Sequence, residues 1–251
     1  METNELLEPF ERMLAKLFPP SRVREIDSSA EWQDELAEVE ASGFLDILAP
    51  EANGGAGLPF SAAIALFAAL GRHAAPLGIG RAMLERAGYG EAHSANSELV
   101  MLSAMMAGAG DRLLAMTTAY ANERVQFGKP IGRQQAVQQN LAVMAEHCVA
   151  VRLTVELAGD GSGPPDGLRA ALAKSVASTA VPLIANIAHS VHGAIGISAE
   201  YDLQLFTRRL HAWRAEQGSE SRHHRSLGKS LLAGDAKSVD WLRAEIFDEI
   251  A

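Results

Sequence analysis

The sequence contains only one cysteine, Cys148, in 251 residues. A single cysteine excludes a disulfide framework and excludes zinc sites built from several thiolates. Most lone buried cysteines are simply small apolar residues, and this composition fits a reducing cytosol. The N-terminus, Met-Glu-Thr-Asn-Glu, is acidic and lacks the basic-then-apolar order of an export signal. We therefore expect a cytoplasmic protein.

Long apolar runs and an excess of positive charge are missing as well. No segment approaches the ~20 unbroken apolar residues that a transmembrane helix requires, so we expect no membrane span. The net charge of −9 argues against binding of duplex nucleic acid, because phosphate neutralisation needs a cationic face. One stretch is locally basic, and it is either a solvated helix face or a site for an anion or a partner. This stretch contains Arg208, Arg209, Arg214, Arg222 and Arg225.

Alternating strand-like runs and internal repeats are not found in the sequence. Apolar residues instead recur every three or four positions, which is the period of an amphipathic helix. Ser28 and Glu31 form a capping-box pattern before one such helix, which Gly43 would end. Asp166 follows a loop rich in glycine and proline and can cap the next helix. Further helices are predicted at residues 99–120, 137–155, 168–192, 200–215 and 221–232.

The pattern predicts an all-α fold with two main parts and a tail. Residues 1–93 form an N-terminal helical domain, and residues 97–232 form an antiparallel bundle that resembles a four-helix bundle. Long helices joined by short loops pack in this near-antiparallel way. Residues 233–251 form an acidic helical tail. The connection between the two domains, about Gly88 to Ser97, is too short to hold a further compact domain.

One break between helices carries unusual chemistry. Residues 120–139 read YANERVQFGKPIGRQQAVQQ. The planar fork of donors on Arg124 matches phosphate oxygens, the Phe127 ring can stack on a heterocycle, and Gly128 lets a backbone approach closely. Together they suit a nucleotide cofactor that contains a pyrophosphate. Alternatively, Arg124 is only a cation near a helix C-terminus, where the helix dipole favours positive charge.

Three segments resemble the acyl-CoA dehydrogenase family. They are PEANGGAGLPFSAAIALFAALGRHAAPL (residues 50–77), YANERVQFGKPIGRQQAVQQNLAVMA (residues 120–145) and HSVHGAIGISAEYDLQLFTRRL (residues 189–210). The resemblance extends over about residues 6–232. It implies helical domains of acyl-CoA dehydrogenase type, which in that family bind FAD at a subunit interface. The family places a β-domain between these helical domains, and this sequence has no segment for it.

The resemblance also implies roles for individual residues. In the family, the loop after the first long bundle helix contacts FAD that is bound mainly by the neighbouring subunit, and a second glycine turn contacts it too. Two departures fall in the second turn, where Ser190 replaces the usual glutamine and Ala194 replaces a glycine. The implied cofactor-binding residues are Arg124, Gln126, Phe127, Gly128, Gln135, Gly193 and Gly196.

The catalytic carboxylate of the family has no direct counterpart. Family members remove an α-proton from an acyl-CoA thioester with a carboxylate while a hydride passes to the flavin. Gln217 occupies the expected position, and an amide cannot act as a general base near neutral pH. The adjacent Glu216 is our candidate catalytic residue, although one step along a helix is a rotation of about 100°. His189 and His192 have a metal-ligand spacing but no third ligand, so we predict no metal site.

Two functional hypotheses follow. In the first, the chain takes part in FAD-dependent α,β-dehydrogenation of an acyl-CoA as a shortened subunit that contributes to a flavin site at an interface. In the second, it is a non-catalytic structural or regulatory homologue that binds neither FAD nor substrate. The expected assembly is a homodimer or tetramer, because the bundle stripes are too apolar to remain exposed, or a heteromer with a full-length acyl-CoA dehydrogenase.

Overall fold

Residues 3–161, 163–234 and 237–247 are described by the structure, which is a computed structural model. The N-terminal part consists of α1 (Thr3–Leu17), α2 (Pro20–Ser29), α3 (Gln33–Ala41), the 3-10 helices η1 (Phe44–Asp46) and η2 (Glu51–Asn53), α4 (Phe60–Arg72) and α5 (Leu77–Ala87). The C-terminal part consists of α6 (Glu91–Glu123), β1 (Val125–Gln126), β2 (Lys129–Pro130), η3 (Ile131–Arg133), α7 (Gln135–Gly159), α8 (Gly167–His192), η4 (Gly193–Ile197), α9 (Leu203–Ala215), α10 (Glu220–Leu232) and α11 (Ser238–Glu245).

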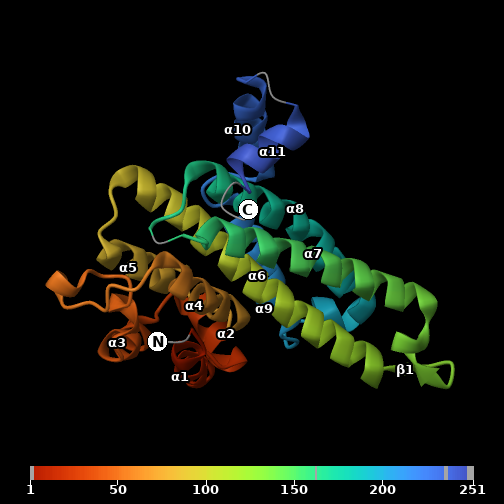
Figure 1. The fold of residues 1–251 in the computed structure, drawn as a ribbon. Coiled ribbons are helices and arrows are strands. Elements are labelled where there is room, and N and C mark those ends of the chain that lie inside the picture. Colours follow the sequence, from red (N-terminus) through yellow and green to blue (C-terminus); the bar gives the residue numbers. More distant parts are fainter. Residues whose placement is uncertain (1–2, 162, 235–236, 248–251) are drawn as a thin grey trace.

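The predicted all-α fold is confirmed. In the described part of the chain, β structure is limited to the short hairpin of β1 and β2. The long helices α6, α7 and α8 lie side by side, and the N-terminal helices gather on one side of them (Figure 1). Helix α6 packs against α4 as well as against α7 and α8. Buried apolar residues form one continuous core from α1 to α9, so the predicted domain boundary stays a prediction.

Two long helical segments are apolar enough to cross a membrane by length and composition alone. They are Glu91–Glu123 and Gly167–Ile197, and 67% and 61% of their most apolar windows are buried inside the protein. Both therefore serve as core helices of the bundle.

The N-terminal helices approach the bundle closely. A Cβ atom on Gly71 of α4 would lie 1.9 Å from the Met105 carbonyl oxygen, and one on Gly108 of α6 would lie 1.8 Å from the Ala68 carbonyl oxygen. The two helices therefore touch through their backbones at these glycines. The chain passes from α5 to α6 through residues 88–90 only, which is shorter than the connection we expected.

Two predicted caps had different outcomes. Asp166 is confirmed as the cap of α8, since its Oδ1 accepts from the N–H groups of Leu168 at 2.8 Å and Arg169 at 3.0 Å. The capping box at Ser28 is wrong, because Ser28 lies in the last turn of α2 and donates to the Glu25 carbonyl. Apolar residues upstream are buried and extend α2 through this position.

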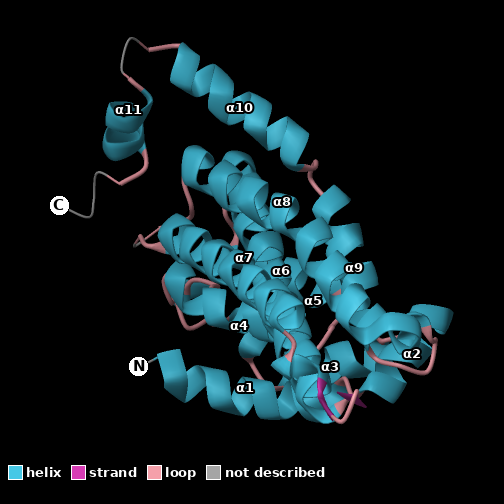
Figure 2. Ribbon diagram, turned by 90° about the vertical axis from the view of Figure 1, so that its right-hand side faces the viewer, coloured by secondary structure: helices cyan, strands magenta, loops and turns pink. Residues whose placement is uncertain are grey.

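The tail begins with a loop and continues as α11. Trp241 and Ile246 are buried, and Arg169 Nε donates to the Ile246 carbonyl at 3.0 Å. Helices α10 and α11 lie at the opposite end of the molecule from α1, α2 and α3 (Figure 2). Residues 235–236 and 248–251 of the predicted tail lie outside the described residues.

The locally basic stretch is partly neutralised within the chain. Arg209 donates to both carboxylate oxygens of Asp27, at 3.1 and 2.8 Å. Arg214 pairs with Glu220 through two hydrogen bonds. Part of this stretch therefore fixes α9 against α2 and α10 instead of forming a free cationic face.

Candidate functional site

Helix α6 ends in a tight hairpin that carries the first group of predicted cofactor residues. The Arg124 N–H donates to the Tyr120 carbonyl at 2.9 Å and closes the last helical turn. Strands β1 and β2 then pair antiparallel. Phe127 and Gly128, between the strands, have φ angles of +51° and +75°, the combination found in type I′ turns. The Ile131 N–H donates to the Arg124 carbonyl at 2.8 Å and ties the hairpin back to the helix.

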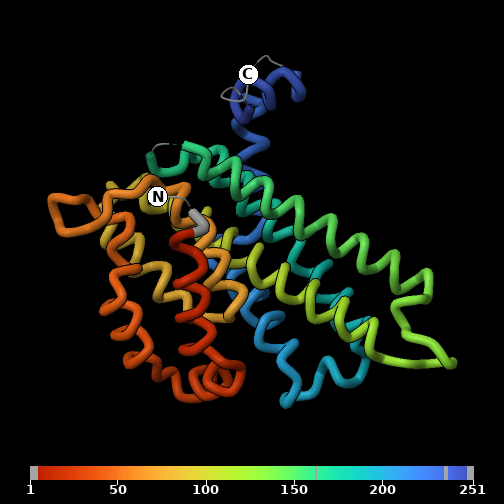
Figure 3. The backbone as a smooth tube through the Cα atoms, turned by 60° about the horizontal axis from the view of Figure 1, so that its bottom comes forward, coloured from red at the N-terminus to blue at the C-terminus, as the bar shows by residue number. Residues whose placement is uncertain are grey.

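The hairpin presents polar and aromatic groups to the outside of the chain. It lies at the far tip of the bundle, away from the N-terminal helices (Figure 3). The Phe127 side chain is 93% exposed, and Arg124, Gln126 and Gln135 are exposed too. Among the described residues, none contacts these three polar side chains through a hydrogen bond or ion pair. Free guanidinium donors beside an exposed ring fit a nucleotide-type ligand held from outside the chain.

The second group of predicted cofactor residues, Gly193 and Gly196, lies in η4, beside the last turns of α6. The Tyr120 hydroxyl donates to the His192 carbonyl at 3.3 Å, and the two rings stack with centroids 4.5 Å apart. Gly193 has a φ of +62°, which favours glycine. A Cβ on Gly196 would lie 3.0 Å from His192 Cβ and 3.1 Å from Leu203 Cδ2. Backbone conformation and packing account for both glycines, so their contact with a cofactor stays a prediction.

The two histidines with a metal-ligand spacing are bonded within the chain. His189 Nε2 lies 3.2 Å from Thr207 Oγ1, and His192 Nδ1 donates to the Ala188 carbonyl at 2.8 Å. Burial is the main cause of the lowered pKa of His192, so its ring is neutral at pH 7. Across the described residues, no group of three or more His, Cys, Asp or Glu side chains is placed to hold a metal ion.

Glu216, the predicted catalytic residue, and Gln217 lie in the loop between α9 and α10. The helix ends at Ala215 and Gln217 has a φ of +54°, so the helical rotation between neighbours no longer applies here. Arg81 Nη2 donates to Glu216 Oε2 at 2.7 Å, and Gln217 Nε2 donates to Glu98 Oε2 at 2.6 Å. Arg81 Nε also donates to Glu98 Oε1 at 2.8 Å. Four side chains from α5, α6 and the loop therefore form one network.

Arg81 is the centre of this network. Burial alone would lower the pKa of Arg81, but its hydrogen bonds to Glu98 and Glu216 raise it. A hollow of about 330 Å³ adjoins the network, and it is lined by Arg81, Leu84, Glu85, Ser94, Glu98 and Gln217. Arg81 bonds only Oε2 of the Glu216 carboxylate, and the ion pair makes that carboxylate a weaker base. No local sequence pattern indicates Arg81, which is 135 residues from Glu216.

The predicted catalytic and cofactor residues of one chain lie far apart. Glu98, which bonds to Gln217, is near the start of α6, and Arg124 follows its end. The helix between these two residues is continuous and spans about 39 Å at 1.5 Å per residue. Tyr120, one helical turn before Arg124, contacts His192 just before η4, while Glu216 belongs to a separate network.

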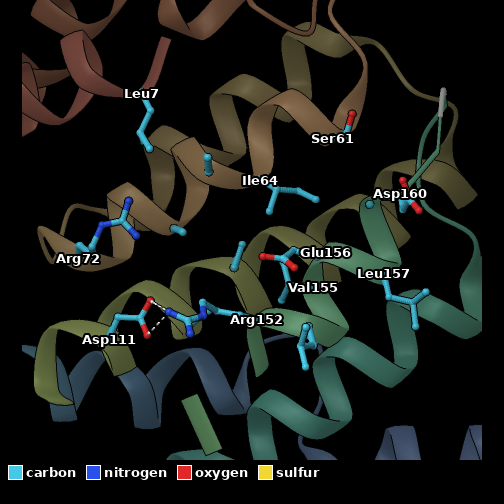
Figure 4. A pocket seen from close by; sticks show the side chains of 16 residues that line it. Leu7, Ser61, Ile64, Arg72, Asp111, Arg152, Val155, Glu156, Leu157 and Asp160 are labelled. Atoms are coloured by element: carbon cyan, nitrogen blue, oxygen red, sulfur yellow. Dashed lines mark hydrogen bonds and ion pairs between the residues drawn. The ribbon is translucent and has the colours of Figure 1, made fainter. Parts of the chain in front are cut away.

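A further cavity of about 580 Å³ lies between α1, α4, α6 and α7. Figure 4 shows Arg152 and Asp111 joined at its rim, where Arg152 Nη1 donates to the carboxylate at 3.4 Å. Burial is the main cause of the raised pKa of Asp111. Ile64 and Val155 are among its apolar lining residues. None of the predicted cofactor or catalytic residues lines this cavity.

Comparison with known proteins places the chain in a family. Residues 91–232, more than half of the chain, match the family profile "Acyl-CoA dehydrogenase, C-terminal domain". The chain belongs to the acyl-CoA dehydrogenase family. This family member is 36% identical over 117 residues to acyl-CoA dehydrogenase IpdE2 of Mycolicibacterium smegmatis, covering 47% of the chain and 37% of that protein. It is 36% identical over 143 residues to glutaryl-CoA dehydrogenase of Desulfococcus multivorans, covering 55% and 36%. The chain thus matches little more than a third of the length of these relatives.

Two solved structures resemble this family member over nearly all of its length. A chain of the ChsE4–ChsE5 complex from Mycobacterium tuberculosis matches with a TM-score of 0.82 and 17% identity, covering 93% of this chain and 98% of that one. A chain of the Tcur3481–Tcur3483 steroid acyl-CoA dehydrogenase matches with a TM-score of 0.79 and 18% identity, covering 94% and 100%. At such identities the likeness shows the fold alone. Because the matched chains are covered almost completely, this helical fold also occurs as a whole chain in solved structures.

Proposed function

We propose that this chain is a shortened, accessory subunit of a heteromeric FAD-dependent acyl-CoA dehydrogenase. The observation that carries the proposal is the hairpin at the end of α6, where Phe127 is 93% exposed and Arg124 is exposed without a side-chain partner among the described residues. A ligand bound there needs a second surface, because the hairpin lies at the tip of the chain (Figure 3). A full-length partner would provide that surface and the β-domain.

Each predicted cofactor residue has a role in this proposal. Arg124 would bind the phosphates, Phe127 would stack on a flat ring, and Gln126 and Gln135 would donate or accept hydrogen bonds at the rim. The backbone of Gly128 and the turn from Gly193 to Gly196 would complete the surface. Bound FAD would supply the hydride acceptor for α,β-dehydrogenation of an acyl-CoA. In this proposal the protein is cytoplasmic.

The network around Glu216 supports the accessory role. Glu216 is the candidate base on this chain, but its carboxylate is bonded to Arg81 at 2.7 Å, and its loop is separated from Arg124 by most of α6. Gln217 cannot take its place as a base. We infer that the base for the shared flavin site comes from the partner. Glu216→Gln should therefore leave turnover of the complex near the wild-type value, whereas loss of turnover by orders of magnitude would assign the base to Glu216.

The partner proposal draws on the comparisons. The ChsE4–ChsE5 complex and Tcur3481–Tcur3483 are assemblies named for two proteins. The curated relatives are about three times longer than the segment that matches. A full-length acyl-CoA dehydrogenase is therefore the proposed partner, and a homodimer or tetramer of this chain is the alternative assembly.

Flavin content provides the test. The chain purified alone should be colourless, and the same chain co-purified with a full-length family member should show a flavin absorbance spectrum. Arg124→Ala in that complex should reduce both bound FAD and acyl-CoA-dependent dye reduction. Arg133→Ala is the matched control, because Arg133 is also exposed and lies in η3 just beyond the hairpin. Unchanged flavin content and turnover in the Arg124→Ala complex would refute the proposal.

The second function is a non-catalytic structural or regulatory homologue. The specific observation in its favour is that Glu216 and Gln217 both make hydrogen bonds within the chain, to Arg81 and to Glu98. This function predicts a colourless homo-oligomer that takes up no FAD, whether alone or mixed with a full-length family member. It also predicts that Arg124→Ala changes neither assembly nor stability.

A further inference from the structure

The loop between α9 and α10 has an unusual backbone. Gln217 and Gly218 follow each other with φ angles of +54° and +91°, and a non-glycine residue such as Gln217 is strained in that region. A Cβ on Gly218 would lie 2.4 Å from Arg222 Cδ, so a larger residue there would displace the Arg222 side chain. Such a conformation persists only where the surroundings fix it.

A buried lysine contacts this loop from inside the protein. Lys174 lies in α8 and its side chain is fully buried, with 0% exposure. Its Nζ donates to Ser178 Oγ at 3.0 Å, to the Arg214 carbonyl at 2.9 Å and to the Gly218 carbonyl at 3.0 Å. An ammonium group has three donors and no acceptor, so its hydrogen-bonding capacity is completely used. The two carbonyls lie on either side of Glu216 and Gln217.

We propose that Lys174 is the residue that positions Glu216 and Gln217, by holding the backbone carbonyls on both sides of them. The Arg214 carbonyl is among the last of α9, where helix ends leave carbonyls without helical partners and favour a cation. Fixing both carbonyls sets the left-handed turn, and the turn directs the two side chains towards Arg81 and Glu98. This inference holds whether or not the chain takes part in dehydrogenation.

The charge around Lys174 is consistent with an ammonium at neutral pH. Burial is the main influence and lowers the pKa of Lys174 to about 8. The carboxylates of Glu220 and Glu216 act in the opposite direction, while the Arg214 guanidinium adds to the lowering. His223 Nε2 lies 3.2 Å from the Gly218 carbonyl, and its pKa is lowered mainly by burial. At pH 7 the lysine is therefore mostly charged and the histidine mostly neutral.

Hydrogen exchange of the loop amides tests this positioning role. The N–H groups of Glu216 and Gly218 donate to the carbonyls of Ala212 and Ala215, both at 3.2 Å. In Lys174→Met, exchange of these two amides at neutral pH should accelerate about tenfold or more, because charge-assisted hydrogen bonds to both sides of the turn are lost. Amides in the middle of α6 should exchange as in the wild type. Lys229→Met, at an exposed lysine of α10, should change neither.

Two results with the Lys174→Met protein would overturn the proposal. One is wild-type exchange at Glu216 and Gly218 in the Lys174→Met protein, and the other is uniform acceleration throughout the bundle, which indicates a general structural role. If Lys174→Met does not fold, lysine side-chain NMR of the wild type decides. The sequence has five lysines, and the signal of Lys174 should exchange slowly with water and show through-space contacts to Arg214 and Gly218. Five rapidly exchanging lysines without these contacts would refute the proposal.

Discussion

Replacing Phe127 by asparagine should stabilise the isolated chain while it weakens flavin retention in the proposed complex. Phe127 occupies the first left-handed position of the hairpin, with φ of +51°. A side chain other than glycine or asparagine costs about 1–2 kcal/mol in this region, whereas Asn-Gly is the preferred pair for such turns. The phenylalanine is 93% exposed, so its removal from the free chain loses almost no buried area. We expect a gain of about 1 kcal/mol in the free energy of unfolding.

Urea unfolding followed by circular dichroism measures this gain, because the midpoint shifts while the slope stays constant when only stability changes. Gly128→Ala is the matched variant in the same turn. Its φ of +75° disfavours alanine, and we expect a loss of about 1 kcal/mol. The two neighbouring variants should therefore shift the midpoint in opposite directions.

The functional half of this prediction uses the complex with a full-length partner. Phe127→Asn removes the stacking surface but keeps Arg124, so we expect reduced FAD content at an unchanged subunit ratio. A Phe127→Asn chain that is less stable than the wild type would refute the argument about the turn. Unchanged FAD content would refute the stacking role of Phe127 without affecting that argument.

Three further predictions concern the core. Gly108→Ala should lower the free energy of unfolding by about 2 kcal/mol in urea titrations, because its Cβ would meet the Ala68 carbonyl oxygen at 1.8 Å. This overpacking outweighs the helix propensity that alanine gains over glycine. Gly228→Ala is the control and should stabilise the protein, since a Cβ there would have nothing within 4 Å. Burial lowers the pKa of Lys174 to about 8, so the unfolded chain binds that proton more tightly. Relative to Lys174→Met, wild-type stability should therefore rise with pH between about 8 and about 10.4, by up to about 1.4 kcal/mol per pH unit, and a flat difference would contradict this. Burial raises the pKa of Cys148 to about 12, so a thiol reagent at pH 8 should react only after unfolding, and rapid reaction of the native protein would show that the thiol is accessible.

Sequence periodicity was sufficient to predict the helices. Apolar residues that recur with the helical period indicate both that a segment is helical and which of its faces is buried. The cap at Asp166 could be predicted for a related reason, since it depends on atoms two and three residues away. The capping box at Ser28 failed because two helices meet there. Serine and glutamate at that spacing fit a helix start, yet burial of Val23 and Ile26 extends the preceding helix to Ser29.

The network around Glu216 could not be predicted in the same way. Arg81 lies 17 residues from Glu98 and 135 residues from Glu216, and their pairing depends on how α5, α6 and the α9–α10 loop meet. Lys174 did leave a signal. It is a single lysine in the run AALAKSVASTAV, whose other residues are small or apolar, and a buried charge of this kind requires partners. Which partners it finds is decided by the fold.

The separation along α6 decides how one chain can contribute to flavin chemistry. Glu98, which bonds to the α9–α10 loop, and Arg124 stand about 39 Å apart along one continuous helix, so one chain cannot bring the loop and Arg124 into the same site. The loop end is closed by bonds within the chain, through Arg81 from α5 and Lys174 from α8. The hairpin end leaves a guanidinium unpaired among the described residues and holds a phenylalanine in a costly, exposed conformation. Neither feature stabilises the isolated chain. Both are explained when another molecule covers the hairpin and contacts these two side chains.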